Sequence, residues 1–322
     1  MNEQSVQIVN SYPKPSVISL FSGAGGSALG YRLGGFNELL GIDIDQTACE
    51  TFQHNFPLTP VWNRDISSVE IEEILQYIDI DVGQLDVLDS SPPCVGFSIC
   101  GRRNIQDKRN NLFLETARFI EGLRPKVFLI ENVLGLMAGK MEGKFNQIFT
   151  QLKSIGYKLQ CKSINTIYYN VSQSRQRLIF LGVREDLPTE PTFPKPNLKV
   201  QRLKDVLPDV DFHSRGQFDK MIKHPELLPY TITKTPSMFF VQDGVQRKPT
   251  IDELKILSSF PENFEFTGTY TQIWNQIGNC VPPLMMKEMS KTIRQDILIH
   301  QNQPEERSNA IRIRTKTTQR EY

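Results

Sequence analysis

The chain has 322 residues, 39% of them hydrophobic and 23% charged, so it can bury a sizeable core and is not a disordered protein. Its formal net charge of +1 excludes bulk attraction of nucleic acid by the whole surface, so any nucleic-acid site has to be a local basic patch. No apolar run reaches the length of a membrane span and the N-terminus lacks a secretory layout, which predicts a soluble, cytoplasmic protein with no membrane partner.

Strands and helices alternate through the first half of the chain. Apolar runs predict strands at 17–21, 39–45, 85–91, 126–133, 158–168 and 177–183. Helical periodicity predicts helices at 46–55, 68–78, 111–122 and 143–155. This alternation predicts an α/β fold with a doubly wound, mostly parallel sheet, whose ligands bind at the carboxyl ends of the strands.

The alternation stops after Glu185. Residues 186–249 hold many prolines and no strong strand run, which predicts a small, loop-rich second domain. Helical periodicity returns at 250–258, and residues 273–297 indicate a loop and then a helix that returns to the first domain. The polar end of the chain is typical of a disordered basic tail. The expected divisions are a first domain over 1–185, a second segment over 186–249, a return over 250–300 and the tail over 301–322.

The turn after the first strand is rich in glycine. Gly23, Gly25 and Ala28 fit the loose dinucleotide fingerprint, and Asp43 follows at about the expected distance of 20 residues. Asp43 can accept hydrogen bonds from ribose hydroxyls, and Asp65, at the next strand end, from an adenine amino group. The pattern does not separate NAD from S-adenosylmethionine, although nothing else in the chain indicates a hydride-transfer site. A turn that only packs a helix on a strand is the alternative.

Cys94 is the cysteine with a chemical interpretation. The five cysteines are odd in number and fit no zinc spacing, so we expect neither a disulfide framework nor a metal site. Cys94 follows a buried strand and two prolines that stiffen the chain, and basic residues come soon after it. A thiol in that position is suited to nucleophilic catalysis. A buried structural cysteine is the alternative.

Charged side chains end the neighbouring strands. Glu131 follows the apolar run VFLI, so we expect it to be partly desolvated, which favours its protonated form. Parallel strand ends lie side by side, so Glu131 can reach the same crevice as Cys94. Arg175 precedes and Arg177 begins the strand RLIFLGV, and alternation places both on one face, where they could bind a phosphate or a base carbonyl. A capping acid and a pair of surface arginines are the alternatives.

Two local basic patches could contact nucleic acid, although runs of charge are usually solvated faces. The first patch follows Cys94, and the second lies in the tail. Their members are Arg102, Arg103, Lys108 and Arg109 in the first, and Arg307, Arg312, Arg314, Lys316 and Arg320 in the second.

Taken together, these motifs resemble the cytosine-C5 DNA methyltransferase family of the bacterial restriction-modification type. Over about residues 16–295 the shared motifs, in the family's usual order, are FSGAGG at 21–26, GIDID at 41–45, RDI at 64–66, PPC at 92–94, ENV at 131–133, QSRQR at 173–177, RKPTIDELKILSSFP at 247–261 and IGNCVPP at 277–283. Each motif is short, but the whole set in one order is specific. The resemblance implies a Rossmann-like class I methyltransferase fold and S-adenosylmethionine as cofactor. It also implies methyl transfer to C5 of a cytosine in a short DNA target.

The resemblance also implies roles for residues and partners. Cys94 would be the nucleophile, Glu131, Arg175 and Arg177 would hold the flipped-out base, and Asn132 would shape the loop. The cofactor site would be lined by Phe21, Gly23, Asp43, Ile44, Asp65, Ile66, Pro93, Leu112, Asn279 and Val281. The expected partners are DNA and a restriction endonuclease acting on the same site, and the expected state is a monomer.

The chain departs from the family in three places. Val95 stands where the family usually has Gln, and Cys100 where Ser or Gly is frequent. The variable segment between QSRQR and RKPT is short, which leaves a tRNA-methylating relative open. A nicotinamide-dependent oxidoreductase is a further alternative, which the PPC, ENV and QSRQR set argues against. A silent nucleic-acid-binding homologue is another, which intact Cys94 and Glu131 argue against.

Overall fold

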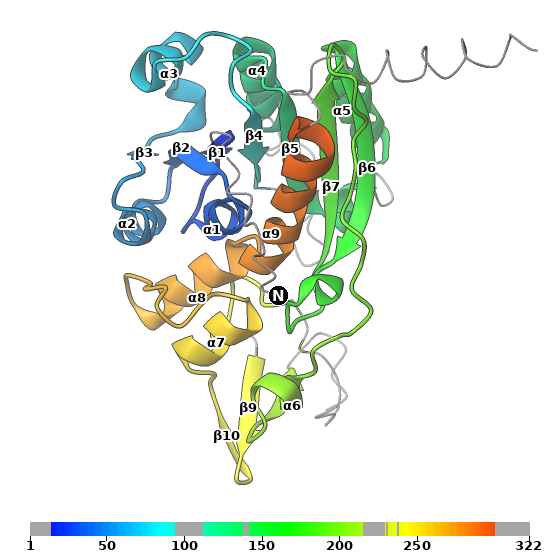
Figure 1. The fold of residues 1–322 in the computed structure, drawn as a ribbon. Helices are drawn as coiled ribbons and strands as arrows, with labels where there is room; N and C mark the ends of the chain where they lie inside the picture. Colours follow the sequence, from blue (N-terminus) through cyan, green and yellow to red (C-terminus); the bar gives the residue numbers. More distant parts are fainter. Residues whose placement is uncertain are drawn as a thin grey trace, which may run out of the picture.

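The computed structural model describes residues 14–93, 112–137, 142–214, 229, 231–236 and 238–299. A seven-stranded sheet forms its body (Figure 1). Its strands lie in the spatial order β3 (Val61–Asn63), β2 (Asn37–Asp43), β1 (Ser16–Leu20), β4 (Val87–Ser90), β5 (Val127–Val133), β7 (Gln176–Arg184) and β6 (Tyr157–Asn165). The first five strands are parallel, and β7 is antiparallel to both of its neighbours. The predicted doubly wound, mostly parallel α/β fold is confirmed.

Helices cover both faces of this sheet. On one face α1 (Gly26–Leu33) packs against α9 (Pro283–Thr292), and the other face carries α3 (Ile71–Ile78), α4 (Leu112–Leu123) and α5 (Glu142–Ser154). Alternate strand residues enter the two cores, so Val17 lies under α1 while Ile18 lies under α3 and α4. Strands buried on both faces are continuous apolar runs, which is why the sequence revealed them. The remaining helices of the body are α2 (Gln46–Asn55), η1 (Ile66–Ser68), η3 (Leu134–Met137), η5 (Thr166–Tyr169) and η6 (Ile293–Leu298).

A smaller unit lies beyond the carboxyl ends of the strands (Figure 1). It holds an antiparallel sheet in the order β10 (Val245–Arg247), β9 (Met238–Gln242) and β8 (Asp211–Ser214), packed with α6 (Leu203–Val206), α7 (Ile251–Leu257) and α8 (Tyr270–Asn279). Trp274 and Phe240 are among its fully buried side chains. The prediction that residues 186–249 contain no strong strand is wrong, because strands of three to five residues are too short for alternation to stand out.

The returning part of the chain is divided between the two units. Residues Leu254 and Ile277, from α7 and α8, lie in the core of the small unit, whereas α9 packs on α1 in the body. The predicted loop at the start of 273–297 is wrong, because α8 continues there, begun by a capping box at Thr269. The four predicted chain divisions stay predictions. Within the described ranges no helix combines the length and the apolar character that crossing a membrane requires.

Candidate active site

The glycine turn between β1 and α1 is packed on one side and open on the other. Phe21 and Gly23 have positive φ angles of 56° and 52°, which turn the chain sharply at the end of β1. A Cβ on Gly26 would lie 2.4 Å from the carbonyl oxygen of Val281, so only glycine allows this approach. A Cβ on Gly23 would meet no described heavy atom within 4 Å. A ligand can therefore approach the turn at Gly23.

Asp43 ends β2 beside this turn. Its carboxylate accepts hydrogen bonds from the backbone N–H groups of Gly23 and Asp45, both at 2.8 Å. Burial raises the pKa of Asp43, and these hydrogen bonds oppose that shift. The next side chain, Ile44, is 69% exposed although it is apolar. An open apolar surface beside a carboxylate suits a nucleoside, which has an apolar base and ribose hydroxyl donors.

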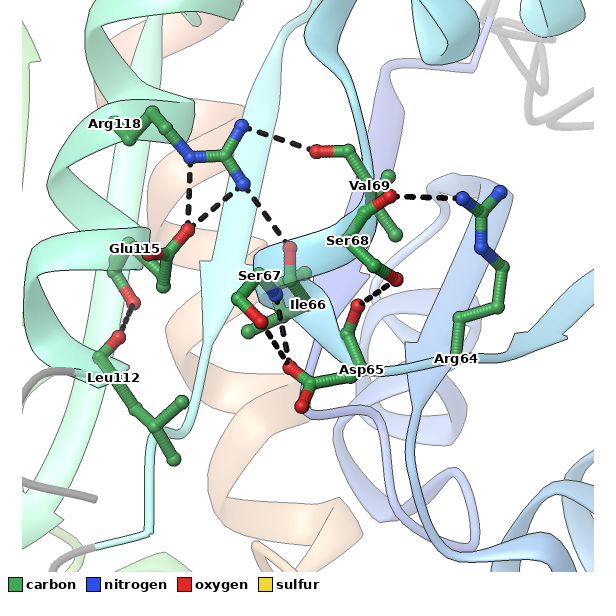
Figure 2. A network of polar contacts seen from close by, with 10 residues as sticks. Arg64, Asp65, Ile66, Ser67, Ser68, Val69, Leu112, Glu115 and Arg118 are labelled. Atoms are coloured by element: carbon green, nitrogen blue, oxygen red, sulfur yellow. Dashed lines mark hydrogen bonds and ion pairs between the residues drawn. The ribbon is translucent and has the colours of Figure 1, made fainter. Parts of the chain in front are cut away.

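Asp65 and Ile66 lie in the loop that follows β3, close to the first turn of α4 (Figure 2). The Oδ1 atom of Asp65 accepts from the N–H and the hydroxyl of Ser67 at 2.9 and 2.8 Å, and these bonds lower the pKa of Asp65. Its Oδ2 atom has no hydrogen bond to another described residue, and the side chain is exposed. Ile66 is buried, and Leu112, the first residue of α4, is half-buried. The loop thus presents a carboxylate oxygen that remains free to accept from a ligand.

The segment after α8 supplies the last predicted cofactor residues. Asn279 ends α8 with an exposed side chain, whose Nδ2 donates to Oδ1 of Asn275 at 2.6 Å. Val281 is buried, with its carbonyl against the glycine turn. Cys280 lies between them, and its burial raises the pKa of the thiol to about 11. This segment packs on the back of the turn, while Asn279 reaches the surface.

Glu131 and Arg177 form a buried ion pair. Glu131 is in β5 and Arg177 in the adjacent antiparallel strand β7, with Arg177 opposite Val133. The Nε atom of Arg177 lies 2.6 Å from Oε1 of Glu131, without the alignment of a hydrogen bond, and both side chains are almost fully enclosed. Removing one member of a buried ion pair leaves the other charge without compensation, which strongly destabilises the fold. The predicted catalytic acid and one predicted arginine are therefore brought together.

Arg175 lies elsewhere. It is buried, and its Nη1 atom donates to the carbonyls of Ile232 and Gly278 at 3.1 and 2.9 Å. Burial lowers the pKa of Arg175 to about 9, and the charge of Arg177 adds to that shift. Arg175 thus links the stretch before β9 to the end of α8. Its role in holding a base stays a prediction.

The nucleophile candidate Cys94 lies outside the described residues, as do Val95, Cys100, Arg102, Arg103, Lys108, Arg109 and the tail from 301 to 322. The segment that leads to Cys94 nevertheless starts at a defined point, because Ser90 ends β4 opposite Ile130 of β5. The hydroxyls of Ser90 and Thr116 lie 2.8 Å apart, which ties this strand end to α4. Pro93, exposed, is the last described residue before Cys94. The loop therefore leaves the sheet one residue short of the level of Glu131.

Two residues that the sequence left without a role connect the site to its surroundings. Gln173 is buried and donates to the carbonyl of Leu257 and the hydroxyl of Ser258, while its Oε1 accepts from the N–H of Ile232. Arg118, in α4, holds the loop that carries Asp65 (Figure 2). Gln173 belongs to the QSRQR motif, which was a usable signal. Arg118 belongs to no motif.

The chain matches a family model over most of its length and is similar to known methyltransferases. A family model described as C-5 cytosine-specific DNA methylase matches residues 16–226 and 213–295. The Type II methyltransferase M.NgoPII of Neisseria gonorrhoeae is 33% identical over 339 residues, covering 89% of this chain and 97% of that protein. The Type II methyltransferase M1.HphI of Haemophilus parahaemolyticus is 29% identical over 323 residues, covering 86% of both.

Solved structures support the fold. A crystal structure of a variant of Spodoptera frugiperda DNMT2 superposes with a TM-score of 0.68 at 19% sequence identity. The match covers 88% of this chain and the whole of that one. The shared architecture is the class I methyltransferase fold, as the strand order indicates.

Proposed function

Because this chain belongs to the C-5 cytosine-specific DNA methylase family, we propose that it moves the methyl group of S-adenosylmethionine to C5 of a cytosine in a short DNA target. The step depends on a transient bond between the cytosine and Cys94. The observation that carries the proposal is that the glycine turn with Asp43 and the Glu131–Arg177 pair lie at the same edge of the sheet. This edge is where ligands bind in doubly wound sheets.

The described residues fit S-adenosylmethionine. The open side of the turn at Gly23 leaves room for the ligand to approach the protein backbone. The hydrogen bond from Gly23 orients Asp43, which would accept from ribose hydroxyls. Exposed Ile44 would cover one face of the adenine, and the free Oδ2 of Asp65 would accept from its amino group. When bound, S-adenosylmethionine supplies an electrophilic methyl group on a sulfonium. The other residues that would line the site are Phe21, Ile66, Pro93, Leu112, Asn279 and Val281.

In the proposed reaction Cys94 makes cytosine C5 nucleophilic. Its thiolate adds to C6, so the Sγ–C6 bond forms and the electrons of the C5–C6 double bond become available at C5. These electrons would form the bond from C5 to the methyl carbon while the bond from that carbon to the sulfonium sulfur breaks, with S-adenosylhomocysteine as the leaving group. A base would then remove the C5 proton, the double bond would re-form and the Sγ–C6 bond would break. C6 cannot be reached inside a stacked duplex, so the base has to be flipped out.

Glu131 and an arginine would hold the flipped base. Glu131 is paired with Arg177 in the free protein, so in the proposed step it would first take up a proton from solvent. It would then donate to N3 and neutralise the charge that addition at C6 places there. The ion pair with Arg177 uses Oε1, so Oε2 remains for the base. Arg177, beside Glu131, is the arginine that we propose for base oxygen O2, whereas Nη1 of Arg175 is already bonded to the carbonyls of Ile232 and Gly278. Asn132 would help to shape this strand end, where its Oδ1 accepts from the N–H of Val133 at 2.8 Å.

The partners follow from this activity. We propose that residues 186–249 read the bases around the target, that the enzyme acts as a monomer in the cytoplasm, and that a restriction endonuclease cuts the same sequence when it is unmethylated. The relatives that support this context are Type II methyltransferases. Because residues 186–249 are few, we expect a target of about four base pairs or fewer, since each base pair read needs its own side-chain contacts.

Incubation of the purified protein with methyl-labelled S-adenosylmethionine tests the proposal. We expect label in C5 of cytosine in duplex DNA, at one short sequence that methylation-sensitive sequencing would identify. Much faster labelling of a tRNA anticodon stem-loop would contradict the DNA assignment. Binding of NADH, with no binding of S-adenosylmethionine, would favour the oxidoreductase alternative.

A further inference from the structure

Arg118 uses both terminal nitrogens of its guanidinium to hold one loop. Figure 2 shows it reaching from α4 to the loop after β3, where Nη2 donates to the carbonyl of Ile66 and Nη1 to the carbonyl of Val69, both at 3.0 Å. Its Nε donates to Glu115, one turn earlier in α4, at 2.8 Å. These two carbonyls mark the start and the end of the tight turn η1. A single side chain therefore fixes both ends of the turn.

The geometry requires arginine. The planar guanidinium has donors on separate edges, so it can serve two carbonyls and a carboxylate at once. Glu115 balances its charge and orients it, and the ring of Phe119 lies 4.5 Å from its central carbon. The more compact ammonium of a lysine has no such fork and would serve fewer of these acceptors.

The loop that Arg118 holds bears two residues of the proposed cofactor site. Asp65 precedes η1 and Ile66 begins it, while Leu112 starts the helix that carries Arg118. The bonds from Arg118 thus set the distance between the loop and α4. We propose that Arg118 is a positioning residue for the adenine of the cofactor, which it places by fixing the loop of Asp65 and Ile66 against α4. This inference rests on the proposed use of S-adenosylmethionine.

The loop has a second attachment that does not involve α4. Arg64 donates from Nη2 to the carbonyl of Ser68 at 2.9 Å and pairs with Glu73. Asp65 also holds Ser67. Loss of Arg118 should therefore displace the loop from α4 without unfolding it. The effect should appear in the binding of adenine.

Arg184 provides a matched control. It pairs with Asp186 and donates to the carbonyls of Gly83 and Arg124, so it also combines an acid with two backbone acceptors. It ends β7 at the opposite edge of the sheet, beside the start of β5. Arg118→Met and Arg184→Met therefore remove similar contacts at different distances from the proposed adenine site.

Calorimetry with S-adenosylhomocysteine and its inosine analogue gives a readout that does not depend on methyl transfer. We expect Arg118→Met to weaken S-adenosylhomocysteine binding about tenfold, Arg118→Lys to weaken it less, and Arg184→Met to leave it within about twofold. The inosine analogue lacks the amino group assigned to Asp65. Wild type and Arg184→Met should discriminate against it, and Arg118→Met should lose most of that discrimination.

Three results would overturn the inference. They are wild-type affinity in Arg118→Met, full discrimination against the inosine analogue in that variant, or an equal loss of affinity in Arg184→Met, which would indicate general destabilisation. Failure of the wild type to bind S-adenosylhomocysteine would instead refute the cofactor assignment and this inference with it. A wild type that binds the ligand but transfers no methyl group would refute only the activity.

Discussion

Replacing Asp89 by asparagine should stabilise the fold at neutral and alkaline pH but not in acid. Asp89 lies in β4 under α1, is 1% exposed, and accepts hydrogen bonds from the hydroxyls of Ser27 at 2.5 Å and Tyr31 at 3.4 Å. Burial raises the pKa of Asp89 to about 7, the bond from Ser27 opposes the shift, and the charge of Glu131 adds to it. The folded protein therefore holds this proton more tightly than the unfolded chain does.

The size of the effect follows from this difference in pKa. The ordinary value is 3.8, so between about pH 4 and about pH 7 the unfolded chain has released the proton while the folded protein keeps it. The free energy of unfolding falls as the pH rises through this window and the loss is complete above pH 7. About three pKa units at about 1.36 kcal/mol each give about 4 kcal/mol. Asparagine avoids this loss, although its amide donors in the core cost about 1–2 kcal/mol at every pH.

Urea unfolding of the wild type and of Asp89→Asn, at several values between about pH 4 and about pH 8, measures the effect. The stability of the variant relative to wild type should rise by about 4 kcal/mol over this range. Comparing the two proteins is necessary because burial also raises the pKa of Glu38; the charge of Asp89 adds to that shift, so the variant relieves this part as well. Ser27→Ala removes a donor to the ionised form, so its cost should grow with pH, in the opposite direction. A difference between wild type and Asp89→Asn that does not change with pH would refute the reasoning.

Three further predictions concern the site. Asp43→Ala should weaken S-adenosylmethionine binding by about 1–3 kcal/mol, because acceptors for the ribose hydroxyls are lost; unchanged affinity by calorimetry would remove Asp43 from the site. Arg177→Ala should abolish methyl transfer and lower the free energy of unfolding by about 3–5 kcal/mol, because it leaves Glu131 buried without its partner; wild-type turnover would contradict this role. Exchanging residues 186–246 for the matching segment of a relative with a known target should transfer that specificity, and a folded, active chimera that keeps its own target would place recognition elsewhere.

The body of the fold could be predicted from the sequence because its signals are local. Strands such as β5 are buried on both faces and appear as uninterrupted apolar runs. Helix α2 was predicted at its observed ends, where Asp45 caps it. Because parallel strands share an edge for their carboxyl ends, the order of elements also placed Asp43 and Glu131 at the same edge.

The remainder depends on contacts that no local pattern encodes. Strands β8, β9 and β10 are short, and pairing with one another stabilises them more than their own alternation does. Arg118 reaches a loop about 50 positions earlier in the chain, a partner that only the folded protein reveals. The two arginines of QSRQR looked equivalent in sequence. In the structure Arg175 is buried and donates to two backbone carbonyls, whereas Arg177 forms an ion pair with Glu131.

A covalent bond between Cys94 and the target cytosine is the step on which the proposed function depends, and 5-fluorocytosine tests it most directly. Fluorine at C5 replaces the proton that has to leave, so the Sγ–C6 bond cannot break after methylation. Duplex DNA with 5-fluorocytosine at the target position, incubated with the protein and S-adenosylmethionine, should yield an adduct that survives denaturation and maps to Cys94 by mass spectrometry. Cys94→Ala should bind S-adenosylmethionine normally and form no adduct. A protein that methylates ordinary DNA but gives no adduct, or an adduct at another residue, would contradict the account.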